Sequence, residues 1–295
     1  MRIIGIDIGG TYIKAGIVSE EKVIHQKKIP TPLPQELSFE IIELAKELGA
    51  EKLGVGVPGL VTADGIVYSP PNFPGIERLP LKEILERELK IPVSVANDAN
   101  CVALGEWKYG AGKGKNNLIV LTVGTGVGGG LIIDGKLYVG RGFAGEIGHI
   151  TVEPNGPPCR CGNYGCLEAF VGSNYMVERA LRGIKLGVDT SLSSHVEITP
   201  EDISENAKAG DRFAKDIIQE IGYYLGIGIA NLVSILDPEM VIIGGGISNA
   251  GEILFSRIRD TVKRRLYSRA QLDIVGAALG DRGGILGSAL YAELF

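Results

Sequence analysis

Three cysteines lie close together in the sequence, and a histidine precedes them: Cys159, Cys161 and Cys166 follow His149. Thiolate sulfurs and an imidazole nitrogen are ligands that zinc prefers, and four of them complete its tetrahedral coordination. The cysteines are too closely spaced for a disulfide framework, and the alternative is three free thiols in a loop. The spacing predicts a closed, structural zinc site with no position left for a metal-activated water. The fourth cysteine, Cys101, is expected to be a small core residue.

Two carboxylates flank these ligands. Glu146 precedes His149 by three residues, and Glu168 follows Cys166 by two. Each would by default be a surface residue, but a bound zinc would orient His149 and hold both acids within reach of one point. Such a point suits a neutral ligand with many hydroxyl groups, because each hydroxyl both donates and accepts hydrogen bonds.

Three glycine-rich turns follow apolar segments that are predicted to be strands. They are residues 9–11, 124–130 and 244–246. The backbone N–H groups of such turns can bind phosphate, although each turn taken alone is equally well a simple hairpin. None has the pattern of a P-loop or of a dinucleotide-binding turn. Asp7, just before the first turn, is either a hydrogen-bonded structural residue or an acid that orients Mg²⁺ through water.

The segment Asn97-Asp98-Ala99-Asn100 lies between a predicted strand and a predicted helix. An aspartate at such a junction is usually the N-cap of the helix. Alternatively, the strand end directs the Asp98 carboxylate toward a ligand, where it would act as a general base. The residues alone leave both interpretations open.

The composition is that of an ordinary globular protein, with 45% hydrophobic and 22% charged residues and a net charge of -5 over 295 residues. This charge disfavours a dedicated nucleic-acid binder, which needs a basic surface. A charge at Asp7 interrupts the apolar start of the chain, so we expect no signal peptide. No apolar stretch is long enough for a membrane span. We therefore expect a cytoplasmic protein.

Hydrophobic periodicity predicts alternating strands and helices. Strands are expected at residues 3–8, 13–18, 53–57, 93–96, 118–123, 131–133 and 241–243, and helices at 37–48, 81–89, 100–109, 212–236 and 284–294. A strand, a glycine turn and a second strand open each half of the chain, which indicates an α/β protein of two similar halves with a cleft between them. The polar segment 110–117 predicts the boundary, which gives domains at residues 1–115 and 116–282.

Six motifs in this sequence resemble the signatures of the ROK family (repressors, open reading frames and sugar kinases), and within it the bacterial-type glucokinases. They are Asp7-Ile8-Gly9-Gly10-Thr11, Gly56-Val57-Pro58-Gly59, Asn97-Asp98-Ala99-Asn100, Gly124-Thr125-Gly126-Val127-Gly128-Gly129-Gly130, Glu146-Ile147-Gly148-His149 and the Cys-x-Cys-Gly-x-x-Gly-Cys-x-Glu run at 159–168. The resemblance implies an actin-like, ribonuclease H-like sugar kinase fold of two α/β domains, with the active site in the interdomain cleft. The last helix, residues 283–295, would return to the first domain, and the larger second domain would carry the zinc loop.

The resemblance also implies a role for each matching residue. Asp98 would be the catalytic base. The sugar would be bound by Asn97, Glu146, His149 and Glu168. The nucleotide and its Mg²⁺ would be held by Asp7, Gly9, Gly10, Thr11, Thr125, Gly126 and Gly245. The zinc would be held by His149, Cys159, Cys161 and Cys166. Tyr12 departs from the family pattern, in which Lys or Asn is frequent, so contacts to the nucleotide at this position stay undefined.

The implied reaction is phosphorylation of glucose at its 6-hydroxyl by ATP, with Mg²⁺, to give glucose 6-phosphate and ADP. Fructokinase, N-acetylmannosamine kinase or a broad hexokinase are alternatives, because no residue can be tied to the 2-position of the sugar. A sugar-responsive repressor is a further alternative, although such proteins carry a helix-turn-helix domain for which Asp7 leaves no room. We expect a homo-oligomer, a dimer or a tetramer, that binds hexose and nucleotide but neither nucleic acid nor membrane.

Overall fold

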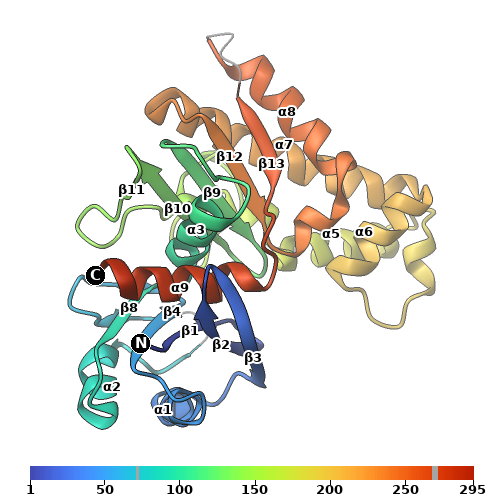
Figure 1. Ribbon diagram of the computed structural model, residues 1–295. Helices are drawn as coiled ribbons and strands as arrows, with labels where there is room; N and C mark the ends of the chain where they lie inside the picture. Colours follow the sequence, from blue (N-terminus) through green and yellow to red (C-terminus); the bar gives the residue numbers. More distant parts are fainter. Residues whose placement is uncertain (71–72, 268–271) are drawn as a thin grey trace. The chain divides into compact units, whose positions relative to one another are not determined.

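The computed structural model describes residues 1–70, 73–267 and 272–295 (Figure 1). The chain forms two compact units. Unit 1 contains residues 1–120, 130–145 and 278–295, and unit 2 contains residues 121–129 and 146–277. Strands and helices alternate along the chain, so the predicted α/β class is confirmed. The domain boundary expected after residue 115 stays a prediction.

Unit 1 is built on a five-stranded sheet with the order β3-β2-β1-β4-β8. The strands are β1 (Ile3–Ile8), β2 (Tyr12–Ser19), β3 (Lys22–Pro30), β4 (Lys52–Val57) and β8 (Val93–Asn97). β1 and β2 pair antiparallel, with Ile8 opposite Ile13, which confirms the predicted hairpin. β4 lies parallel to both β1 and β8.

Helices cover both faces of this sheet (Figure 1). They are α1 (Leu37–Glu47), α2 (Leu81–Leu89) and α9 (Arg282–Leu294), with a short 3-10 helix at Pro34–Glu36, while α3 (Asp98–Tyr109) packs mainly against α9. Leu37, Ile41, Leu81 and Leu85 are fully buried against the isoleucines of β1, so α1 and α2 cover one face. A further small sheet has the order β5-β6-β7 and contains Leu60–Val61, Val67–Tyr68 and Arg78–Leu79.

Glycines on two central strands bring α9 onto the other face. A Cβ on Gly5 of β1 would collide with the carbonyl oxygen of Ile285, and one on Gly54 of β4 with that of Ser288. The helix backbone therefore rests directly on the strands. The buried carboxylate of Glu106 accepts hydrogen bonds from the backbone N–H of Ala278 at 3.1 Å and of Leu279 at 2.8 Å, which fixes the segment that leads into α9.

A second five-stranded sheet has the order β11-β10-β9-β12-β13. Its strands are β9 (Leu118–Val123), β10 (Val127–Ile133), β11 (Lys136–Leu137), β12 (Met240–Gly244) and β13 (Asp273–Gly276). The expectation of a glycine turn over residues 124–130 is wrong in its extent, because β10 begins at Val127. Gly130 serves close packing instead: a Cβ there would collide with Ala103 of α3.

The helices of unit 2 follow its part of this sheet along the chain. They are α4 (Glu168–Val171), α5 (Ser173–Lys185), α6 (Pro200–Ala209), α7 (Arg212–Leu236) and α8 (Glu252–Arg265), with 3-10 helices at Ile147–His149, Ser191–Ser194 and Gly246–Ala250. The bounds of α7 are those predicted from the sequence. Among the described residues, no helix combines the length and the apolar character that crossing a membrane requires.

Candidate functional site

The four predicted zinc ligands lie together in unit 2. One ligand atom from each of His149, Cys159, Cys161 and Cys166 lies within 4.8 Å of the other three. The Sγ of Cys159 is 3.6 Å from Nδ1 of His149, and the Sγ of Cys161 is 3.7 Å from that of Cys166. Sulfur ligands about 2.3 Å from a tetrahedral zinc lie about 3.8 Å apart. The cluster is therefore compatible with structural zinc.

Local backbone hydrogen bonds shape the loop of residues 159–166, which carries the three cysteines and which we call the metal loop. The N–H of Cys159 donates to the carbonyl of Asn163 at 2.7 Å, and that of Gly162 donates back to Cys159 at 3.0 Å. Gly165 has φ +67°, and a Cβ there would collide with the carbonyl oxygen of Glu153. The glycines of the Cys-Gly-x-x-Gly-Cys run thus let the loop turn back on itself and bring its thiols together.

The protonation of the thiols depends on their surroundings. Burial raises the pKa of Cys159 and raises that of Cys166 to about 12, whereas a backbone hydrogen bond from Asn163 lowers the pKa of Cys161. Two of the three thiols are therefore protonated at neutral pH in the metal-free protein. A metal that binds them as thiolates must displace these protons.

His149 presents its two ring nitrogens to different groups. Nδ1 faces the Sγ of Cys159, and Nε2 lies 3.9 Å from Oε2 of Glu146. Desolvation raises the pKa of Glu146, the His149 ring opposes this rise and the Glu168 carboxylate adds to it. The side chains of His149 and Glu146 are 34% and 42% exposed, so a ligand can reach both from solvent. One ring nitrogen thus lies toward the cysteines and the other toward Glu146.

Glu168, at the start of α4, links the metal loop to the second glycine turn. Its Oε2 accepts a hydrogen bond from the N–H of Val127 at 2.9 Å, and its Oε1 lies 4.0 Å from the Sγ of Cys159. The close approach requires a glycine at position 126, where a Cβ would lie 2.6 Å from the Glu168 carboxylate. The carboxylate therefore contacts both predicted ligand-binding features of unit 2.

Ser173, at the start of α5, holds the other end of this turn. Its N–H and its Oγ both donate to the carbonyl oxygen of Gly124, at 2.9 and 2.8 Å. The N–H of Gly124 in turn donates to Gly126 at 2.9 Å, and Thr125 is left exposed at the tip. We call Glu168 and Ser173 the turn clamp. The role of Ser173 was not predicted. A serine directly after a glycine at the start of an amphipathic helix does indicate that its hydroxyl bonds to nearby backbone.

The third turn adjoins the second within unit 2. Gly245 has φ +87°, and a Cβ on it would lie 2.8 Å from the backbone nitrogen of Val123, the residue that precedes the second turn. The Oγ of Ser248 donates to the carbonyl of Gly245 at 2.7 Å. Two of the predicted phosphate-binding turns thus lie side by side.

In unit 1, Asn97 and not Asp98 caps helix α3. The Asn97 Oδ1 accepts a hydrogen bond from the N–H of Asn100 at 3.1 Å, and its Nδ2 donates to the carbonyl of Gly59 at 3.1 Å. Asp98 is the first residue of the helix, and its Oδ1 accepts from the N–H of Ala99 at 2.9 Å. The interpretation of Asp98 as an N-cap is therefore wrong. The partly buried carboxylate lies at the positive end of the helix dipole.

The first glycine turn is held by its own hairpin and by the end of β3. The N–H of Gly9 donates to Tyr12 at 3.0 Å. Thr31 donates from its N–H to the carbonyl of Thr11 at 2.9 Å and from its Oγ1 to that of Gly9 at 2.7 Å. Gly10 and Thr11 remain exposed at the tip, where a ligand can reach them. Thr31 was not predicted, and its position after a strand gives no local signal.

Asp7 lies beside the start of α9. A Cβ on Gly284 would lie 2.6 Å from either oxygen of the Asp7 carboxylate. Burial raises the pKa of Asp7 to about 6, although the Lys14 ammonium opposes this rise. Lys14 donates to Oδ1 of Asp281 at 2.8 Å, which lowers the pKa of Asp281. Asp7 is therefore ionised above about pH 6 and is able to hold a cation-bound water.

The predicted site residues thus form two groups, one in each unit. Unit 1 holds Asp7, Gly9, Gly10, Thr11, Asn97 and Asp98, and unit 2 holds Thr125, Gly126, Glu146, His149, Cys159, Cys161, Cys166, Glu168 and Gly245. Within unit 2 the geometry brings the metal ligands, Glu146, Glu168 and the second turn together. The roles of these residues in binding and catalysis stay predictions. Cys101 is fully buried in α3, as expected of a core residue.

The two sheets, each with a glycine turn at the end of its central strand, define an actin-like, ribonuclease H-like α/β protein. The family model described as "ROK family" matches residues 3–294, and the chain belongs to this family. A glucokinase from Halalkalibacterium halodurans is 38% identical, over 96% of this chain and 92% of that protein. A xylose repressor from Caldicellulosiruptor bescii is 36% identical, over 97% of this chain and 76% of the repressor.

A solved structure extends this similarity to three dimensions. It is a ROK family glucokinase from Streptomyces griseus in complex with glucose and AMPPNP, which is 36% identical with a TM-score of 0.90. The alignment covers 100% of both chains. The ROK assignment and the fold predicted from the six motifs are therefore confirmed.

Proposed function

We propose that this protein is a hexose kinase that transfers the γ-phosphoryl group of ATP to the 6-hydroxyl of glucose. The observation that carries the proposal is the grouping of His149, Glu146 and Glu168 beside the Cys/His cluster, which offers an imidazole and two carboxylates to a polyhydroxyl ligand. Its family and its similarity to glucokinases support the same activity.

In this proposal Asp98 accepts the proton of the sugar 6-hydroxyl as the bond to phosphorus forms. Positioned proton transfer of this kind contributes about 10²–10⁴-fold to the rate. The capping bond belongs to Asn97, so the Asp98 carboxylate is not required to begin α3. The Nδ2 of Asn97 is held on Gly59, which fixes the strand end that carries both residues.

The glycine turns would hold the nucleotide. Gly10 and Thr11 in the first turn, Thr125 and Gly126 in the second, and Gly245 in the third would offer N–H groups or hydroxyls to phosphates and ribose. Gly9, whose N–H is bonded to Tyr12, would let the phosphates come close to the backbone because it has no side chain. Asp7 would hold Mg²⁺ through water, and that ion would neutralise charge on the transferred phosphoryl group. The ionised state of Asp7 above about pH 6 fits this role.

Zinc would be bound by His149, Cys159, Cys161 and Cys166 and would have a structural role. With Nδ1 on the metal, the imidazole of His149 is fixed and its Nε2 faces the sugar side. Ligand residues held in this way position the groups around them. The zinc would thus orient the sugar-binding residues without taking part in phosphoryl transfer.

A kinetic comparison tests the proposal. Initial rates of ADP formation are measured with glucose, fructose, mannose and N-acetylmannosamine, with ATP as donor. We expect kcat/KM to be highest for glucose. A preference for another hexose would retain the kinase and correct its substrate, whereas no turnover of any sugar, with sugar binding intact, would favour the sugar-responsive regulator suggested by the repressor relatives. Sedimentation of the same preparation tests the expected homo-oligomer.

A further inference from the structure

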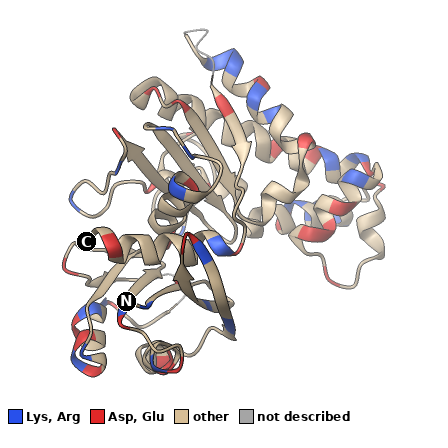
Figure 2. Ribbon diagram, viewed as in Figure 1, with Lys and Arg blue, Asp and Glu red and all other residues tan. Residues whose placement is uncertain are grey.

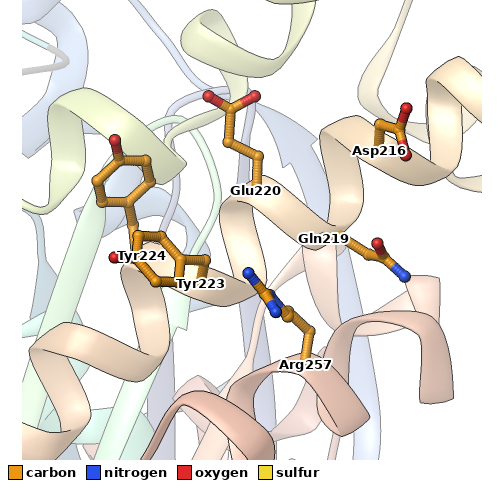
Figure 3. Close-up of a pocket in the computed structure, with 6 residues that line it drawn as sticks. All are labelled: Asp216, Gln219, Glu220, Tyr223, Tyr224 and Arg257. Atoms are coloured by element: carbon orange, nitrogen blue, oxygen red, sulfur yellow. The ribbon is translucent and has the colours of Figure 1, made fainter. Parts of the chain in front are cut away.

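Helices α7 and α8 of unit 2 border two hollows that share residues. The first is about 350 Å³ in volume and is lined by Asp216, Gln219, Glu220, Tyr223, Tyr224 and Arg257 (Figure 3). The second is about 260 Å³ and is lined by Tyr223, Arg257, Thr261, Arg264 and Arg265. Tyr223 and Arg257 line both, so the two hollows adjoin. None of these residues belongs to the metal loop or to a glycine turn.

The stem of Arg257 is fixed where the two helices cross. A Cβ on Gly222 of α7 would lie 3.0 Å from the Cβ of Arg257 and 3.1 Å from the carbonyl oxygen of Leu254. A side chain at position 222 would press on both helices, so the glycine suits this close approach. Because its first side-chain carbons are packed, Arg257 loses less conformational freedom on binding a ligand than a free surface arginine would.

The guanidinium of Arg257 has an unused donor. Among the described residues, its Nε–H is buried and has no hydrogen-bond partner. The nearby Glu220 does not supply one, because its carboxylate accepts from the Tyr175 hydroxyl at 2.8 Å and from Arg179 at 3.1 Å. A buried donor without a partner is costly, and native proteins keep few of them. The Nε–H itself has almost no exposed surface, so an anion bound to the guanidinium would gain this hydrogen bond only through a small shift of the side chain.

Two further arginines come from the same face of α8. Arg264 and Arg265 follow Arg257 by about two helical turns, and none of the described residues that line this second hollow is acidic. The guanidinium carbons of Arg257 and Arg265 lie 5.3 and 5.8 Å from the centre of the Tyr223 ring, and Arg265 also donates to the Tyr223 hydroxyl at 3.3 Å. Figure 2 shows the basic residues that recur along α8. The hollow thus concentrates positive charge.

We propose that these hollows form a binding site for a small phosphorylated molecule. The forked donors of arginine match the oxygens of a phosphoryl group, which would lie among Arg257, Arg264 and Arg265. The rest of the molecule would extend over Tyr223 into the first hollow. There Gln219 and Asp216 offer hydrogen bonds to hydroxyl groups. The volumes suit a metabolite rather than a protein segment.

Calorimetric titration tests this site with two probes, inorganic phosphate and glucose 6-phosphate. The test variant is Arg257→Gln, which keeps the packed stem and removes the guanidinium. The matched control is Lys263→Gln, which removes the same charge from α8 at an exposed residue outside both hollows. We expect Arg257→Gln to weaken binding by about 10- to 100-fold, as the loss of charge-assisted hydrogen bonds predicts, and Lys263→Gln by less than about twofold.

Each outcome bears on the proposal. Tighter binding of glucose 6-phosphate than of phosphate, with both weakened by Arg257→Gln, supports a metabolite site that uses both hollows. Equal affinity for the two probes, with the same loss in the variant, supports a site for the phosphoryl group alone. Equal binding by the two variants places the anion elsewhere and overturns the proposal. A change of sedimentation in Arg257→Gln without phosphate binding to the wild type would instead assign the surface to a subunit contact.

Discussion

The glycine turns after β1 and β9 follow central strands of two sheets with matching order, yet they are supported in different ways. Thr31, which directly follows β3, holds the first turn through its hydrogen bond to the carbonyl of Gly9. The turn clamp, Glu168 and Ser173, holds the second, and both of its residues come after the metal loop in the sequence. One predicted phosphate-binding turn thus depends on local strand pairing, whereas the other depends on residues that follow a loop whose shape a metal would fix.

The largest expected effect concerns the proposed proton transfer to Asp98, which depends neither on Thr31 nor on the turn clamp. Asp98→Asn keeps the size of the side chain but removes its ability to take a proton. We expect kcat to fall by about 10²–10⁴-fold, with glucose affinity and thermal unfolding close to wild type. The measurement is steady-state kinetics together with calorimetry.

Asp134→Asn is the matched control for this prediction. Asp134 lies in a turn with φ +51°, a conformation that Asn also accepts, and it is outside every predicted site. Its kcat should stay within about twofold of wild type, as is usual for a substitution away from the reacting groups. If Asp98→Asn kept more than about a tenth of the wild-type kcat, another group would have to be the base.

The second effect is a pH dependence of zinc binding by the cysteines of unit 2. The pKa of Cys166 is raised to about 12 and that of Cys159 is also raised, so both thiols lose protons when zinc binds. Each released proton tightens zinc binding by about tenfold per pH unit, so the protons of these two thiols alone give about 100-fold between pH 6.5 and 7.5. Competition with a chromophoric chelator measures this slope. A zinc affinity independent of pH would show that the thiols are already ionised.

Removing one of the predicted zinc-binding residues should weaken the binding of substrates to unit 2. Cys161 is exposed, so Cys161→Ala removes little packing, but it takes one thiol from the cluster. Glucose affinity should fall by about 10- to 100-fold, the usual effect of lost support around ligand groups. AMPPNP affinity should fall less, because only the second turn loosens. The main thermal transition should persist, since a core of this size needs no metal to fold.

Cys101→Ala is the control, because it removes a buried thiol of unit 1 far along the chain from the metal loop. Elemental analysis should show about one zinc per chain in this control and less in Cys161→Ala. Equal glucose affinity in the two variants would show that the metal is remote from the sugar.

The smallest effect tests the clamp itself. Ser173→Ala removes the hydroxyl bond to Gly124, which is worth about 0.5–1.5 kcal/mol, so KM for ATP should rise about two- to tenfold with little change in KM for glucose. Ser234→Ala is matched to it, because the Ser234 hydroxyl also donates to a backbone carbonyl but within α7, at 2.9 Å. An unchanged KM for ATP in Ser173→Ala would show that the turn holds its shape without the clamp.

Much of this molecule follows from patterns that are local in the sequence. The strand at Ile3–Ile8, the helices at Leu81–Leu89 and Arg212–Leu236 and the cysteine cluster could be predicted because each rests on its own periodicity or ligand spacing. Helix α6 could also have been found, since Thr199 and Asp202 form a capping box with Pro200 at its start.

Other features depend on contacts between distant residues. Glycines 128–130 were expected in a turn, but they lie in β10, where Ala103 of α3 leaves no room for a Cβ on Gly130. Thr31 and Ser173 also depend on distant residues, because their hydrogen-bond partners lie 22 and 49 residues away. Nothing in the immediate neighbourhood of either residue indicates which carbonyl it would bind.

The position of α9 has a consequence for synthesis of the chain. The backbone of this helix rests on β1 and β4, whose residues Gly5 and Gly54 leave their face of the sheet bare until Ile285 and Ser288 arrive. During translation, unit 2 is therefore complete before unit 1 can bury its second face. Contacts this distant in sequence form slowly. We therefore expect unit 1 to finish folding only after the last helix has been synthesised.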